Sequence, residues 1–126
     1  MSRAEYTLEE YRAAAAALAP KGGDVPFVCV RCGTVQSARS FARAGVKSEV
    51  FEDAVGFSCI GRFARDVGCD WTVGGFLADL GRGAEITTPD GKKHLRFPFG
   101  TAEEAARLSA AEGATFVRAG AEGGAL

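Results

Sequence analysis

Four cysteines are the residues of this 126-residue chain whose type and spacing could do chemistry. Cys29 and Cys32 form a C-x-x-C pair, and Cys59 and Cys69 follow as single residues. Cysteine thiolates are ligands of zinc, and four of them complete its tetrahedral shell with no position left for a substrate. The spacing therefore predicts one structural Zn²⁺ site, which would stabilise the fold and perform no metal chemistry.

Two other states of these cysteines stay open. The thiols could be unmetallated, either buried or paired in disulfides, because free cysteine is among the most buried residue types. They could also form a redox-active C-x-x-C, a motif that stands at a helix N-terminus beside a βαβ unit. Here the segment 33–35 separates the motif from the next expected helix, and no βαβ pattern follows. A zinc ribbon usually has a second C-x-x-C, with two residues between the cysteines, whereas nine residues separate Cys59 from Cys69.

Length and composition favour one small domain over residues 1–126. A core of this size leaves a thin stability margin, which a structural metal would widen because its binding free energy adds to that of folding. The net charge of −1 favours neither nucleic acid nor a membrane surface. No apolar run approaches the ~20 residues of a transmembrane helix. Glu5, Glu9 and Glu10 stand where a signal peptide would be positive, so we expect a cytoplasmic protein with no membrane partner.

The first segment, 1–24, is expected to be a helical arm. Thr7 and Glu10 form a T-x-x-E capping box, and Tyr6 can pack on Tyr11 as a hydrophobic staple. The apolar residues that follow recur at helical spacing, which predicts an amphipathic helix over 7–19 that docks on the core.

The second segment, 25–77, is expected to be the zinc core. A strand over 25–30 delivers Cys29, and a short helix capped by Ser37 follows over 37–44. Alternating residues further along predict a hairpin that joins the last two cysteines. The pairs expected across this hairpin are Cys59 with Cys69, Phe57 with Trp71 and Val55 with Val73.

The third segment, 78–119, is expected to be a second hairpin and a helix. Asp90-Gly91 is typical of a two-residue turn, and a capping box at Thr101 predicts a helix through about Ala111. An edge strand at 115–117 and a frayed tail at 120–126 complete the chain. The expected pairs of the second hairpin are Thr88 with Lys93, Ile86 with Leu95, and Glu85 with Arg96. The fold class is therefore α+β, a small zinc-ribbon-like domain with β-hairpins, an N-terminal helix and a C-terminal helix.

A basic window makes nucleic-acid binding an alternative function. Its four cations are Arg31, Arg39, Arg43 and Lys47. Phosphate contacts require such side chains to be exposed on one surface and free of carboxylate partners. The same residues could equally form an ordinary solvated face, or be neutralised by the acids that follow at 49, 52 and 53.

Little in the chain points to an enzyme. His94 is the single histidine, and its alternation with core-facing neighbours predicts a solvent-facing strand position. No Ser-His-Asp set, phosphate-binding loop or dinucleotide fingerprint is present in the sequence. We therefore expect no catalytic activity.

Three blocks of sequence around the cysteines resemble a family of small phage and prophage proteins. They read F-V-C-V-R-C-G-T-V-Q-S-A-R at 27–39, G-F-S-C-I-G-R-F at 56–63 and G-C-D-W-T-V-G-G-F at 68–76. The resemblance covers about 27–77. It implies a phage or prophage setting, hence the host cytoplasm, and a four-cysteine site, but no activity.

Three functions follow as hypotheses. The first is a zinc-stabilised accessory module that binds another protein. The second is a nucleic-acid-binding zinc-ribbon protein that uses the basic window. The third, which rests only on the phage resemblance and the small size of the chain, is a counter-defence inhibitor of a host nuclease or surveillance complex.

Overall fold

The computed structural model describes residues 4–20, 24–73, 80–110 and 115–117. The fold is α+β, as predicted, with short strands and helices that follow one another along the chain. In order they are β1 (Ala4–Thr7), α1 (Leu8–Leu18), β2 (Phe27–Val28), β3 (Thr34–Gln36), α2 (Ala38–Arg43), α3 (Ser48–Phe51), the 3₁₀ turn η1 (Ile60–Arg62), β4 (Ala84–Thr87), β5 (Lys93–Arg96), α4 (Ala102–Ser109) and β6 (Phe116–Val117). The expected tail at 120–126 lies outside the described residues.

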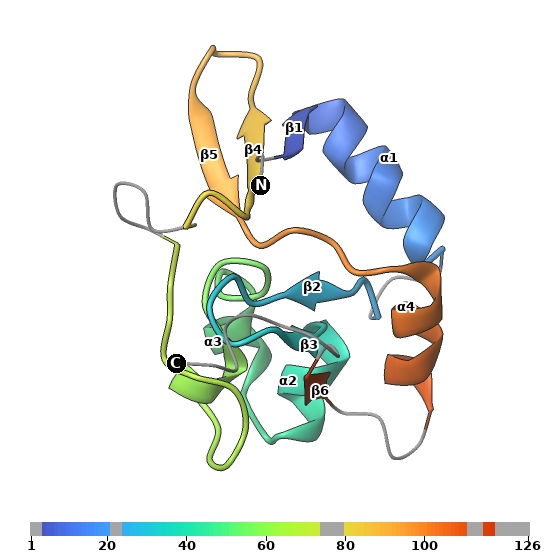
Figure 1. The fold of residues 1–126 in the computed structure, drawn as a ribbon, viewed down its shortest axis with the longest axis vertical. Helices are drawn as coiled ribbons and strands as arrows, with labels where there is room; N and C mark the ends of the chain where they lie inside the picture. Colours follow the sequence, from blue (N-terminus) through green and yellow to red (C-terminus); the bar gives the residue numbers. More distant parts are fainter. Residues whose placement is uncertain (1–3, 21–23, 74–79, 111–114, 118–126) are drawn as a thin grey trace.

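The strands form two small sheets, with orders β1-β4-β5 and β2-β3-β6. In Figure 1 the first sheet and α1 occupy the upper part of the molecule, and the second sheet lies below them with α2, α3 and α4 around it. The main buried cluster includes Cys29, Cys59, Phe41 and Phe97, and the partly buried Cys32 and Cys69 pack against it.

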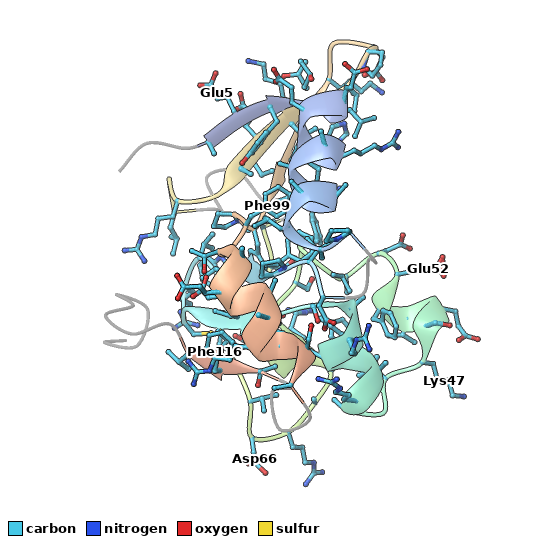
Figure 2. The ribbon with its side chains drawn as sticks, turned by 90° about the vertical axis from the view of Figure 1, so that its right-hand side faces the viewer. Glu5, Lys47, Glu52, Asp66, Phe99 and Phe116 are labelled. Atoms are coloured by element: carbon cyan, nitrogen blue, oxygen red, sulfur yellow. The ribbon has the colours of Figure 1, made fainter. Side chains whose placement is uncertain are left out.

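The N-terminal helix forms as its capping signals predict. The Thr7 side chain accepts a hydrogen bond from the Glu10 N–H, and the Glu10 side chain accepts one from the Thr7 N–H. Tyr6 packs edge-on against Tyr11 with ring centroids 5.6 Å apart, and Tyr11 stacks on Phe99 at 4.8 Å. The aromatic contacts therefore dock α1 on the rest of the fold, where Figure 2 shows Phe99 beside the lower turns of the helix.

Strand β1 was not predicted. Its four residues end at the helix cap Thr7 and pair in parallel with β4, with Ala4 opposite Ala84. A parallel partner so far along the chain leaves no local turn signal, because only an antiparallel hairpin needs one. β1 therefore closes the first sheet at the edge opposite to β5.

The second hairpin forms, but its predicted register is wrong by one residue. Ile86 pairs with His94 and Glu85 pairs with Leu95. The loop has three residues rather than two, because the Thr88 N–H donates to the Lys92 carbonyl and the Gly91 N–H donates to the Thr88 carbonyl. Pro89 suits the first central position of a type I turn, and Gly91 then takes the left-handed conformation at φ 85°. The expected pairs Thr88 with Lys93 and Glu85 with Arg96 are wrong for the same reason.

Within the residues that the structure describes, the hairpin expected between Cys59 and Cys69 is reduced to one bridge, between Ser58 and Thr72. The Cys59 N–H donates to the Trp71 carbonyl, and the Val73 N–H donates to the Phe57 carbonyl. The predicted pairs (Cys59–Cys69, Phe57–Trp71, Val55–Val73) are therefore wrong by two residues. An even offset keeps every side chain on its expected face of the ladder.

The remaining elements follow their capping signals. Ser37 caps α2, and Thr101 caps α4 through a reciprocal hydrogen-bonded pair with Glu104. α4 ends at Ser109, and Leu108 is fully buried. β6 pairs with β3 as the expected edge strand. None of the helices in the described ranges is long and apolar enough to cross a membrane.

Candidate metal centre

The C-x-x-C pair lies in a tight turn between β2 and β3. The Cys29 N–H donates to the Thr34 carbonyl, and the Gly33 N–H donates to the Cys29 carbonyl, both at 3.0 Å. Gly33 has φ 78°, a conformation that a residue with a Cβ rarely adopts. The turn thus holds the side chains of Cys29 and Cys32 on one side, as a zinc knuckle requires.

The other two cysteines lie at the ends of a loop that folds back on itself. Cys59 precedes η1, and Cys69 donates its backbone N–H to the Cys59 Sγ at 3.3 Å. The return is close, because a Cβ at Gly68 would stand 2.6 Å from the Cys59 Sγ and φ there is +60°. A Cβ at Gly61 would collide with the backbone of Cys69. These two glycines explain how nine residues can bring Cys59 and Cys69 together without a second C-x-x-C.

The four sulfur atoms lie within 4.8 Å of one another. The Sγ atoms of Cys29 and Cys69 are 3.6 Å apart, and those of Cys32 and Cys59 are 3.8 Å apart. A tetrahedron with metal–sulfur bonds of about 2.3 Å has sulfur–sulfur edges of about 3.8 Å. The cluster therefore has about the size that a tetrahedral metal ion needs, and it uses all four predicted ligands.

The surroundings of the cluster change how readily its thiols lose their protons. Burial raises the pKa of the Cys69 thiol to about 11. The side-chain hydrogen bond between Cys29 and Cys32 raises the pKa of Cys29 and lowers that of Cys32. Four neighbouring thiolates in a buried site need a positive charge between them. A divalent cation would supply it, so the four cysteines can act together as thiolate ligands only when a metal ion is bound.

Gln36 is a residue of the site that the sequence analysis missed. It is fully buried in β3, and its amide nitrogen donates to the Cys59 Sγ at 3.5 Å and to the Thr34 carbonyl at 3.2 Å. Its amide oxygen accepts the Ile60 N–H at 2.7 Å. Gln36 thus connects the knuckle to the loop after Cys59. The signal available in the sequence was the spacing of two residues from Thr34, which places both side chains on the same face of a strand. In the structure the Thr34 hydroxyl lies 3.0 Å from the Cys32 Sγ.

The arginines of the basic window contact other parts of the fold. Arg39 pairs with the buried carboxylate of Asp24 at 3.1 Å. Arg43 donates to the Leu108 carbonyl at 2.7 Å, at the C-terminal end of α4. A cation at that end of a helix also complements its dipole.

Arg31 belongs to the metal loop. It pairs with Asp70 at 3.7 Å and lies over the Trp71 ring at 5.3 Å. Lys47 is exposed at the start of α3. Phosphate binding was expected only if the three arginines were free of carboxylate partners, and two of them are paired. Their partners are Asp70 and Asp24, not the expected acids at 49, 52 and 53.

His94 does not face solvent as expected. It is half-buried, shares a face of the first sheet with Ile86, and lines a cavity beside α1. The one-residue change of register accounts for this, because it places His94 instead of Leu95 opposite Ile86. A register shift of one residue changes which side chains share a face of the sheet.

Among the comparisons with known proteins, a family model is the one that matches the chain. No curated protein and no solved structure matches the chain. The sequence model of the VVA0879-like family matches residues 7–100, which include α1, all four cysteines and the second hairpin. This match is longer than the 27–77 stretch on which the phage resemblance rests. The chain therefore belongs to the VVA0879-like family.

Proposed function

We propose that this protein is a small zinc-stabilised module that binds another protein and catalyses no reaction. The observation that carries the proposal is the cluster of four cysteine sulfurs within 4.8 Å. Four thiolates leave no open coordination position on zinc, so such a site stabilises structure. The phage resemblance of the cysteine blocks supports an accessory role in a phage or prophage.

Zinc is the metal that this donor set favours. Four sulfur ligands in a tetrahedron select zinc or iron among the common metals, and zinc needs no redox partner. We expect protein purified without added metal to contain about one equivalent of zinc per chain by elemental analysis. Iron in its place would give an absorbing, coloured protein, and a folded preparation without metal would contradict the proposed site.

Exposed apolar side chains near the metal site support protein binding. Val50 and Phe63 are 45% and 39% exposed. Phe51 and Phe63 both pack against the buried Phe41, with ring centroids 5.8 Å from it. We call Val50, Phe51 and Phe63 the α3 patch. Figure 2 shows Lys47 and Glu52 on the flank of the molecule that carries α3. Exposed aromatic and aliphatic residues with charged neighbours are typical of protein interfaces.

Phe63→Ser should abolish binding of the partner while the fold survives. The partner would be captured from the bacterial host by the zinc-loaded wild-type protein and identified by mass spectrometry. Val117→Ser is the matched control, because Val117 is 58% exposed and lies on β6, outside the α3 patch. Equal recovery of the partner with both variants would show that the α3 patch is not the interface.

Nucleic-acid binding is measured in the same preparation. The arginines already contact Asp24, Asp70 and the end of α4, so we expect weak binding to duplex DNA. Tight binding with a steep salt dependence, lost in Arg39→Gln, would favour the nucleic-acid alternative. An inhibitor of a host nuclease or surveillance complex would instead be recognised by the identity of the captured partner.

A further inference from the structure

A cavity of about 180 Å³ lies between α1 and the first sheet, away from the metal site. Leu8 and Tyr11 of α1 form one wall, and the buried Ile86 of β4 lies on the sheet side. His94 and Arg96 of β5, together with Thr88 from the turn, complete the lining. The cavity is open to solvent, and its lining combines apolar side chains with a few polar groups, as is typical of ligand-binding pockets.

The polar groups of the cavity are held in place by contacts outside it. The Tyr11 ring packs between Tyr6 and Phe99. The Arg96 guanidinium lies 4.8 Å from the centre of the Phe57 ring and donates one N–H to the Leu95 carbonyl. A guanidinium has five N–H donors. The hydrogen bond to Leu95 therefore orients the group and leaves other donors for a ligand. Such preorganisation lowers the entropy cost of binding.

A second held group stands at the rim. His94 Nε2 lies 3.4 Å from the Thr88 hydroxyl, which in turn donates to the Asp90 carboxylate. The Asp90 carboxylate contacts the lining residue Thr88 but does not itself line the cavity. The described lining residues include no acid. Among the described lining residues, Arg96 is therefore the one with a permanent charge.

The hydrogen-bond donors of the cavity determine the charge of the ligand that it can bind. Burial raises the pKa of Tyr11 to about 12, so its hydroxyl stays protonated near neutral pH. The guanidinium group of an arginine carries a permanent positive charge. An O–H donor and a guanidinium fork over an apolar floor match a planar carboxylate attached to a small apolar body. A phosphate dianion fits less well, because one permanent cation cannot offset the cost of burying two charges.

We propose that this cavity binds the carboxylate of a small apolar acid, with the carboxylate at Tyr11 and Arg96 and the apolar body on Leu8 and Ile86. Its volume is below the ~300 Å³ at which cavities for drug-sized ligands begin, so the ligand is a short acid or the terminal residue of a polypeptide. Both sources present the same chemistry. The inference is independent of the α3 patch, and either can fail alone.

The test uses the zinc-loaded full chain and NMR of its single histidine. Benzoate and 4-methylpentanoate should shift the His94 ring signals and saturate below about 10 mM, as expected for ligands of this size. Benzamide, which has the shape of benzoate without the charge, and inorganic phosphate should not. A peptide that ends in leucine, with a free or an amidated C-terminus, distinguishes the sources. If only the free-carboxylate peptide binds, the ligand is the end of a polypeptide, and if only the free acids bind, it is a small metabolite.

Tyr11→Phe should weaken benzoate binding about tenfold, since it removes one hydrogen bond to a charged group. Tyr6→Phe is the matched control, because Tyr6 packs on the same ring but does not line the cavity. Arg96→Gln should abolish binding, with Lys92→Gln as its control for lost charge. Two results would overturn the proposal. One is equal affinity for benzoate and benzamide, and the other is an unchanged affinity in Tyr11→Phe when the variant is folded by its NMR spectrum.

Discussion

Cys59→Ser should unfold the protein at room temperature rather than lower its melting temperature by a few degrees. Cys59 is fully buried, and its Sγ accepts hydrogen bonds from both the Cys69 N–H and Gln36. A serine hydroxyl is a poor zinc ligand, and the three remaining thiolates hold the ion weakly. Since binding of a structural zinc contributes about 10 kcal/mol or more to folding, its loss exceeds the stability of a typical small domain.

Circular dichroism and thermal melting measure this effect. A chelator should convert the wild-type protein to the same unfolded state, and added zinc should refold the wild type but not the variant. Ser58→Ala is the local control, because it removes one hydrogen bond to Thr72 in the same segment and should cost only about 1 kcal/mol. Cooperative melting of Cys59→Ser near the wild-type temperature would show that the core is stable without the metal.

The second large effect is expected at Gln36. Gln36→Leu keeps the volume of the side chain but removes the donor to the Cys59 Sγ and leaves the buried Ile60 N–H without its acceptor. The unpaired N–H alone costs about 1–3 kcal/mol, and loss of a partner to a metal ligand typically reduces metal affinity 10–100-fold. We therefore expect a lower midpoint of denaturant unfolding and weaker zinc binding in competition with a chromophoric chelator.

Gln36→Glu separates the two parts of this effect. A glutamate can still accept the Ile60 N–H, but it cannot donate to the thiolate and it adds a negative charge beside four sulfurs. Zinc affinity should therefore fall at least as far as in Gln36→Leu. Thr34→Val removes the corresponding contact to the Cys32 Sγ and should therefore also lower zinc affinity, while the Ile60 N–H keeps its acceptor. An affinity near that of the wild type in both Gln36 variants would assign Gln36 a packing role only.

The parts of the fold that could be predicted are those encoded by neighbouring residues. The helix starts at Thr7, Ser37 and Thr101 were predicted correctly, because a cap is a contact between residues three positions apart. The four cysteines were identified by type and spacing alone. In each of these cases the physical interaction and the sequence signal span the same few residues.

The registers of the hairpins could not be predicted in this way. Asp90-Gly91 is compatible with two turn types, and Gly91 has a positive φ in both. They differ at Asp90, which would need a positive φ in the two-residue turn and does not have one. Between Cys59 and Cys69, the close approach at Gly61 and Gly68 determines the path, and it depends on what each glycine meets in space. Gln36 likewise acquires its role from Ile60 and Cys59, which lie more than twenty residues away in the chain.

The ends of the chain close both sheets, and this affects how the protein assembles during synthesis. Ala4 of β1 pairs with Ala84 of β4, and Val35 of β3 pairs with Phe116 of β6. Each pair spans about 80 residues, so neither sheet is complete until most of the chain has left the ribosome. The cysteines, by contrast, are all present once Cys69 has emerged. Contacts between distant residues form slowly because the intervening loop must first be ordered. Zinc capture can therefore come first on the ribosome, giving a folded centre on which β1 and then β6 are added last.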